Sequence, residues 1–369
     1  MPVDWEKVRS EFPALAGWTY LDTATFGQLP RRTTDAVARH FAHRDELACS
    51  DFVDWFSDAD AIRGDIAGLI NSTADDIAFV PNAAFALATF LNGIDWRRGA
   101  RIVTLENEFP NNLYYPALLA NRGVEFVETA WDQFYDNIPP RTRAVLLSTC
   151  NYTNGFRPPL KEISTFLRDR GVLLFIDATQ SMGALQFDVE DIRPDMVAVH
   201  GYKWLLSPNG AGFMYVRPEL RERMPPLVVG WRSDRNWRNV DNLHHGAPQF
   251  KNTAEKYEGA MLEFPALYGM GASVELMHEI GPGEIEERVL GLAVQVKDVL
   301  EGHGGQVQHL NSPIVAAKFD GVQTSELAVR LKEKRILVSS RHGNLRVSVH
   351  FYNNEQDIAA LNQGLQGEL

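Results

Sequence analysis

Two residues of the sequence have the types and positions that the chemistry of an aldehyde cofactor requires. Lys203 lies in the stretch AVHGYKWLLSPNGAGFMYV, after an apolar run and before a Pro-Gly loop, and Asp177 ends the apolar run LLFID. Ligands of open α/β sheets bind where strands end. A lysine can form a Schiff base with pyridoxal phosphate, while a carboxylate holds the ring nitrogen protonated. The pair predicts such a site, although either residue alone is equally compatible with a helix cap or a surface lysine.

The elements that must position these two residues indicate an α/β fold. Most of the strand candidates are apolar on both faces, as strands covered by helices on both sides must be. They span 101–105, 125–129, 144–149, 172–177, 195–199 and 211–216, with helical patterns at 113–121, 159–170 and 179–192. This alternation is typical of βαβ units and predicts a largely parallel sheet. A further helix is expected to begin near Asn82.

The sequence also predicts how the chain is divided. Residues 217–255 are rich in Pro, Gly, Asn and Trp and predict a long irregular excursion. Such excursions inside compact chains usually have a function. We expect a large cofactor-binding domain over 20–255 and a small C-terminal domain over 256–369. The N-terminal segment, 1–19, is expected to pack on the small domain.

Composition and charge exclude several classes of protein. The 369 residues are 45% hydrophobic and 23% charged, which suffices for a sizeable core. The formal net charge is −12 and no Lys/Arg block stands out, so neither nucleic acid nor an anionic membrane is an expected partner. Two cysteines, Cys49 and Cys150, form neither a disulfide framework nor a metal-ligand cluster. We expect no metal, and, since the first residues lack the order of a signal peptide, a cytoplasmic protein.

Separated motifs resemble the class V aminotransferase family, which includes cysteine desulfurases, kynureninase and isopenicillin-N-epimerase-like proteins. Besides the stretch around Lys203, the motifs that recur in the family's order are YLDTATFGQLP (20–30), EFPNNLYY (108–115), NYTNGFRPPLKEI (151–163), KYEGAMLEFPALYGM (256–270) and LRVSVHFYNNEQDI (345–358). The resemblance implies fold type I of the pyridoxal phosphate enzymes: a large domain with a mostly parallel seven-stranded sheet between helices, and a smaller α/β C-terminal domain. It also implies pyridoxal phosphate, an amino-acid substrate and a homodimer with shared active sites.

The resemblance implies roles for residues around the cofactor ring. Lys203 matches the Schiff-base lysine and general acid/base, and Asp177 matches the partner of the pyridine nitrogen. Gln180 is expected to hydrogen-bond the cofactor's phenolic oxygen or the Schiff-base region. Phe109 stands where the family has an aromatic residue or a histidine that stacks on the ring; the alternative is a core phenylalanine.

The resemblance also implies contacts to the cofactor's oxygen and to the substrate's carboxylate. Either Asn151 or Tyr152 is expected to reach the cofactor's oxygen. Arg346 matches the arginine that binds the substrate's α-carboxylate, a role for which a guanidinium suits better than an ammonium. Strand alternation puts Arg346 and Ser348 on one face, which we expect to look into the cleft without a permanent acidic partner. Arg341 is the alternative clamp.

The expected phosphate site differs from that of most relatives. The free N–H groups of Ala83 and Ala84, at the start of a helix, suit a phosphate. Many relatives have Thr where Ala84 stands, and the desulfurases usually have Ser and His where His200 and Tyr202 stand. Met261 replaces a Thr that often comes from the second subunit.

The sequence favours some reactions over others. Desulfurases of this family use a cysteine on a loop before the carboxylate-binding arginine, and the stretch ILVSSRHGNLRVS contains none. We therefore expect an aminotransferase, with a C–S or C–Se lyase or an epimerase as alternatives, and contacts to the substrate side chain from 230–237 and 244–250. A nucleotide-binding α/β protein is a weaker hypothesis, because no GxGxxG or P-loop string is present. A member that binds cofactor but has lost turnover is a third.

Overall fold

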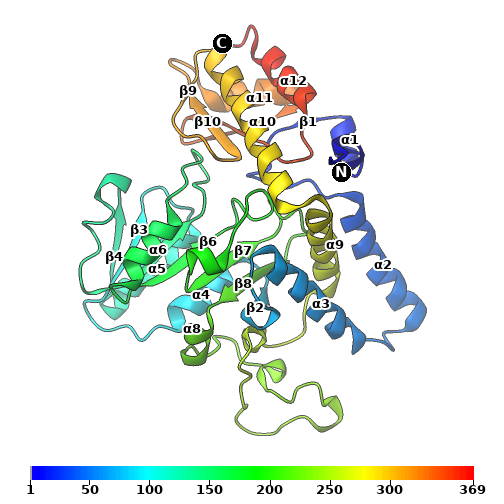
Figure 1. The fold of residues 1–369 in the computed structure, drawn as a ribbon, viewed down its shortest axis with the longest axis vertical. Helices are drawn as coiled ribbons and strands as arrows, with labels where there is room; N and C mark the ends of the chain where they lie inside the picture. The colour runs from blue at the N-terminus through cyan, green and yellow to red at the C-terminus, as the bar shows by residue number, and fades with distance from the viewer. Residues whose placement is uncertain (1) are drawn as a thin grey trace.

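A seven-stranded sheet forms the centre of the computed structural model, which describes residues 2–369 (Figure 1). In spatial order its strands are β2 (Ile77–Val80), β8 (Gly212–Val216), β7 (Met196–His200), β6 (Leu173–Asp177), β5 (Thr142–Ser148), β3 (Arg101–Leu105) and β4 (Glu125–Thr129). The five strands from β7 to β4 run parallel, whereas β8 is antiparallel to both β7 and β2. The mostly parallel sheet is confirmed; β2 and the reversal at β8 were not predicted.

Helices cover both faces of this sheet because successive residues of the central strands are apolar on opposite sides. In β6, Leu174 and Ile176 belong to one hydrophobic cluster and Phe175 belongs to the other. The first cluster includes residues of α6 (Leu160–Arg168), and the second includes residues of α4 (Ala83–Asn92). The other helices of this body are α2 (Arg31–Leu47), α3 (Asp54–Leu69), α5 (Asn111–Leu118), α7 (Val189–Ile192), α8 (Pro218–Arg223) and α9 (Phe264–Ile280).

The C-terminal residues form a second, smaller sheet that is antiparallel throughout. Its strands, in order, are β12 (Ser339–Arg341), β13 (Asn344–Ser348), β10 (Ile314–Lys318) and β9 (Gln306–Val307), and its helices are α10 (Pro282–Gly302), α11 (Thr324–Glu333) and α12 (Glu355–Leu365). The N-terminal segment lies beside it at the top of Figure 1. There β1 (Thr19–Tyr20) pairs with β11 (Ile336–Leu337), and Arg9 of α1 (Trp5–Arg9) forms an ion pair with Asp357 at 2.8 Å.

One predicted helix is mostly absent. The helix expected over 179–192 exists only as Val189–Ile192, and turns occupy most of the preceding residues. Gly183 explains the difference: its φ is +99°, and a Cβ there would lie 2.3 Å from the Trp204 carbonyl oxygen. Cys49 lies just beyond the end of α2, with φ +60°.

The predicted excursion is present between α8 and the short 3₁₀ helix Ala254–Tyr257. It contains only single 3₁₀ turns, at Trp231–Ser233 and Val240–Asn242, and extends beyond the sheets at the bottom of Figure 1. Within residues 2–369, no helix combines the length and the apolar character needed to span a bilayer.

Candidate active site

Lys203 lies at the carboxyl edge of the large sheet, three residues after the end of β7. Its side chain is buried, and burial lowers the pKa of the ammonium to about 8, although the charge of Asp177 acts in the opposite direction. The segment before α2 packs tightly here: a Cβ on Gly27 would lie 1.9 Å from the Lys203 carbonyl oxygen. A fixed lysine with a lowered pKa is a suitable nucleophile for an aldehyde.

Asp177 ends the neighbouring strand, β6, where it pairs in register with Ala198. Its carboxylate accepts the N–H of Thr179 at 2.9 Å. Burial raises the pKa of this carboxyl, whereas the hydrogen bonds from Thr179 and the charge of Lys203 lower it. Among the described residues the carboxylate has no ion pair within 4 Å. A buried carboxylate of this kind can bind a protonated ring nitrogen.

Aromatic rings border Lys203. Its Nζ lies 5.3 Å from the ring centroid of Phe109 and 5.4 Å from that of Tyr202. Phe109 is 36% exposed, so the alternative of a core phenylalanine does not apply. Its ring meets Tyr152 edge-on at 5.3 Å. Phe109 therefore has a free surface next to the lysine, as stacking on a cofactor requires.

Glu108 holds the Phe109 segment in place through contacts that no pattern in the sequence indicates. Its buried carboxylate accepts the backbone N–H of Ser148 at 2.7 Å and the Ser148 hydroxyl at 2.5 Å, and Asn112 donates to it at 3.2 Å. Burial raises the pKa of this carboxyl. Ser148 is the register neighbour of Asp177, so two buried carboxyl groups stand one strand apart.

The expected phosphate site also comes together. Asn82 caps α4 by accepting the N–H of Phe85 at 3.0 Å, so the earlier N–H groups at Ala83 and Ala84 have no intrahelical partner. Val80, before this cap, and His200 are both register partners of Gly212, so β8 alone separates the strand that leads into α4 from His200.

His200 and Tyr202 complete this end of the site. Burial lowers the pKa of His200 to about 4, so the imidazole is neutral, and its buried Nε2 has no hydrogen-bond partner in the described part of the chain. The ring of Tyr202 lies 4.4 Å from that of His200. Met261 is 59% exposed and available to another chain.

Gln180 and Asn151 are largely engaged within the protein. Gln180 accepts from the Trp204 indole at 2.9 Å and donates to the Ala24 carbonyl at 3.2 Å, which leaves one N–H free. The Asn151 amide donates to the Asn107 carbonyl at 3.0 Å and accepts from Thr153. The structure thus leaves each amide a single N–H for a ligand.

Arg346 corrects one expectation. It shares a face with Ser348, as predicted, but it has a permanent acidic partner: its Nη2 lies 3.2 Å from Asp22 Oδ1. It also donates to Thr25 Oγ1, Ser339 Oγ and the Tyr152 carbonyl, and is 1% exposed. The expectation failed because Asp22 comes from a segment 324 residues away, which strand alternation cannot reveal.

Sequence similarity identifies the family of the chain. The model of the family described as "Aminotransferase class-V" matches residues 19–361. The chain belongs to this family. A relative described as a probable cysteine desulfurase, from Methanothermobacter thermautotrophicus, is 25% identical over 98% of this chain and 97% of its own. The uncharacterized aminotransferase YcbU of Bacillus subtilis is 23% identical, with coverages of 96% and 95%.

Solved structures show the same fold. A mutant of C-DES with glycine covalently linked to its PLP cofactor superposes with a TM-score of 0.89 at 22% identity, over 97% of this chain and 99% of the other. The cysteine desulfurase CsdA of Escherichia coli gives 0.88 at 21% identity, with coverages of 99% and 98%. The class V chain therefore has fold type I and is a pyridoxal-phosphate-dependent enzyme.

The residues present fit this cofactor. A buried lysine with a lowered pKa, a carboxylate without a cation and an orphaned imidazole nitrogen all face the same edge of the sheet. These groups correspond to what the aldehyde, the ring nitrogen and the phosphate of pyridoxal phosphate require.

Proposed function

We propose that the protein is an aminotransferase that acts on an α-amino acid, with Lys203 as the Schiff-base lysine. The observation that carries this proposal is the placement of Lys203 and Asp177 at adjacent strand ends, both buried, with the open face of Phe109 beside them. Pyridoxal phosphate, when bound, supplies an aldehyde for the substrate amine and a ring that stabilises negative charge at the α-carbon.

Each residue then has a distinct part. The lowered pKa of Lys203 provides a neutral amine near pH 8, which can take the α-proton and return it to another carbon. Asp177 keeps the ring nitrogen protonated, and Phe109 fixes the ring plane. The start of α4 and His200 hold the phosphate. Arg346, with one N–H left after its four hydrogen bonds, binds the substrate's α-carboxylate.

A C–S lyase is the second candidate, because several relatives are named cysteine desulfurases and a solved neighbour is described as a cystine C–S lyase. Desulfuration through an enzyme persulfide is disfavoured. Burial raises the pKa of the Cys150 thiol to about 11, and its sulfur contacts Ser312 Oγ at 3.1 Å. Cys49 lies beyond α2, outside the group of residues around Lys203.

The attachment site can be tested by chemistry alone. The purified protein should have a visible absorption band that borohydride bleaches. Mass spectrometry of the reduced protein should then find the pyridoxyl adduct on Lys203. An adduct on any other lysine would overturn the assignment.

The reaction can be tested with a panel of amino acids. Transamination predicts conversion of the cofactor to its amine form, with release of a 2-oxo acid and no sulfide. Release of sulfide or of a persulfide from cystine would favour the lyase instead. Exchange of the α-proton for deuterium without either product would indicate an epimerase.

A further inference from the structure

The face of the small sheet that carries Arg346 holds a second arginine. Residues alternate along β12, so Ser339 and Arg341 share the face on which Ser339 accepts a hydrogen bond from Arg346 at 3.1 Å. Arg341 lies closer to the tip of the hairpin. Both guanidinium groups donate to Thr25 Oγ1, Arg341 at 3.2 Å and Arg346 at 2.6 Å. Two cations therefore converge on one hydroxyl.

Only the inner arginine is neutralised. Arg346 is ion-paired with Asp22 and uses four of its five N–H groups. Arg341 is half-buried and uses two, one to the Ser340 carbonyl at 2.8 Å and one to Thr25. Across residues 2–369 no carboxylate lies within 4 Å of Arg341. It has three free N–H groups and an uncompensated charge.

Two more polar side chains lie near Arg341: His342, at the tip of the hairpin, and Tyr152, which contacts His342. His342 and Gly343 have φ of +49° and +78°, as a tight two-residue turn between strands requires. The turn brings His342 Nε2 to 3.2 Å from the Tyr152 hydroxyl. Tyr152 in turn touches Phe109, which borders Lys203. The wall beyond Phe109 thus offers a guanidinium, a phenol and an imidazole.

We propose that Arg341, Tyr152 and His342 form a subsite for an anionic group on the substrate's side chain, and that the enzyme prefers amino acids with a side-chain carboxylate. The proposal rests on the proposed function, in which Arg346 binds the α-carboxylate. A guanidinium with three free N–H groups can bind a carboxylate through two parallel hydrogen bonds. An apolar side chain would leave this charge unpaired.

The test uses the holoenzyme and the change that amino acids cause in its cofactor absorption. L-aspartate and L-glutamate are titrated beside L-asparagine and L-glutamine, which have nearly the same shape without the charge. Hydrogen bonds between charged groups predict half-saturation by the acids at roughly 10- to 100-fold lower concentration than by the amides. Arg341→Met should bring this ratio close to one, and Arg341→Lys should restore part of it.

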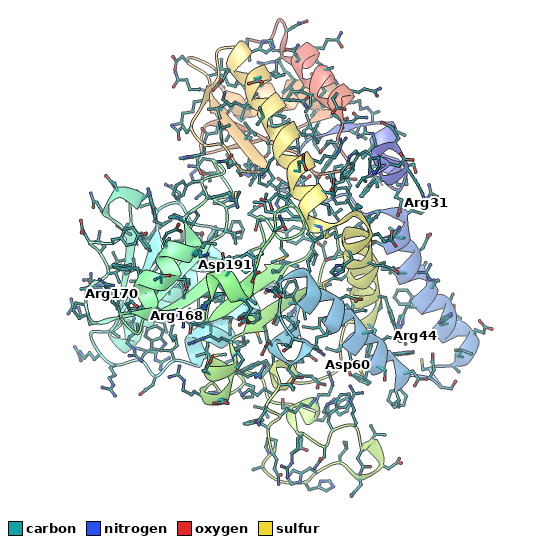
Figure 2. All side chains as sticks on the ribbon, viewed as in Figure 1. Arg31, Arg44, Asp60, Arg168, Arg170 and Asp191 are labelled. Carbon is teal, nitrogen blue, oxygen red and sulfur yellow. The ribbon has the colours of Figure 1, made fainter. Side chains whose placement is uncertain are left out.

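Arg168→Met is the matched control, because Arg168 is an exposed arginine in the last turn of α6 (Figure 2), a helix that contributes no residue to the proposed site. It should keep the wild-type ratio. Equal half-saturation by acids and amides in the wild type would overturn the proposal, even if Arg341→Met does not fold. So would an Arg341→Met protein that weakens both classes equally, because Arg341 would then bind the α-carboxylate. If no amino acid changes the absorption, the proposed function itself fails.

Discussion

The burial of Lys203 should make the rate of cofactor uptake depend on pH. Its pKa is lowered to about 8 by burial, so the ammonium form dominates below pH 8 and the amine above it. Only the amine attacks an aldehyde. The rate of pyridoxal phosphate uptake by the apoprotein should therefore rise about tenfold per pH unit below pH 8 and level off above. Stopped-flow absorbance from pH 5.5 to 9.5 measures this; a rate still rising at pH 9.5 would mean an ordinary lysine pKa.

Replacing Asp177 separates charge from shape. Asp177→Asn keeps the size of the side chain but removes the carboxylate that holds a protonated ring nitrogen. The loss of a charge-assisted hydrogen bond predicts turnover roughly 10- to 100-fold lower. Cofactor content, measured after alkaline release, serves as the control and should stay near the wild-type value. Unchanged turnover at full cofactor loading would contradict the pairing.

Candidate site residues could be predicted from the sequence where they follow the end of a strand. Lys203 and Asp177 each follow an apolar run, and residues at the carboxyl ends of neighbouring parallel strands must meet at one edge. Asp22 and His342 gave no such signal. Asp22 contacts Arg346 of the small sheet, and His342 contacts Tyr152, which is 190 residues away. Such contacts between distant segments depend on how the two sheets are oriented relative to each other. The hydrophobic periodicity of the sequence does not contain this information.

A buried ion pair between Asp22 and Arg346 connects the segment after β1 to the small sheet. Asp22 accepts from Arg346 and from Ser339, and both partners are nearly inaccessible. Removing one partner of such a pair leaves an unpaired buried charge, so Asp22→Asn or Arg346→Met should each lower the free energy of unfolding by roughly 3–5 kcal/mol. Urea unfolding of the apoproteins measures this. The double variant should lose clearly less than the sum of the two; an additive loss would mean that the two residues act independently.

The cap of α4 serves both the helix and the phosphate. Asn82→Ala removes the acceptor for the Phe85 N–H and should reduce stability by about 1 kcal/mol. It should also raise the dissociation constant for pyridoxal phosphate, because the free N–H groups lose their fixed direction. Asn354→Ala, at the corresponding cap of α12, is the control. It should cost similar stability without changing cofactor affinity, and equal effects on affinity would refute a phosphate role for α4.

The elements were predictable to the extent that their patterns were regular. The strand runs at 101–105 and 125–129 match β3 and β4 residue for residue. Buried parallel strands are apolar on both faces, as β3 is, whereas β4 is an edge strand in which only Thr129 is buried. The stretch 179–188 has helical composition, but Gly183 lies against the Trp204 carbonyl in a conformation that a helix does not contain. β2 was missed because four residues are too few to show a period.

For the whole molecule, the sequence predicted the layered α/β architecture but not the close joining of its two sheets. Runs that are apolar on both faces required helices on both sides, and the observed clusters occupy both faces. Three contacts join the two parts of the chain. They are the pairing of β1 with β11, the ion pair of Asp22 with Arg346, and the contact of the His350 ring with the Trp204 carbonyl at 2.8 Å. These contacts place the small sheet's arginines beside Lys203, so the site requires both parts of the chain.

The excursion carries an exposed apolar patch. Leu227, Val228 and Val229 are consecutive and all exposed, Val229 by 52%. Scattered exposed apolar residues are ordinary, but a continuous patch marks an interaction surface. The family resemblance implies a homodimer, and we propose that a second copy of the chain covers this patch.

Light scattering at assay concentrations should therefore show a dimer. Val229→Asp should shift it toward monomer, because an unpaired carboxylate would be buried in the interface. Val294→Asp is the control: Val294, on α10, is 51% exposed and lies outside the excursion. If the excursion also completes the neighbour's site, Val229→Asp should lose cofactor faster on dilution than Val294→Asp. A wild-type protein that is monomeric yet retains cofactor and activity would show that each chain holds a complete site.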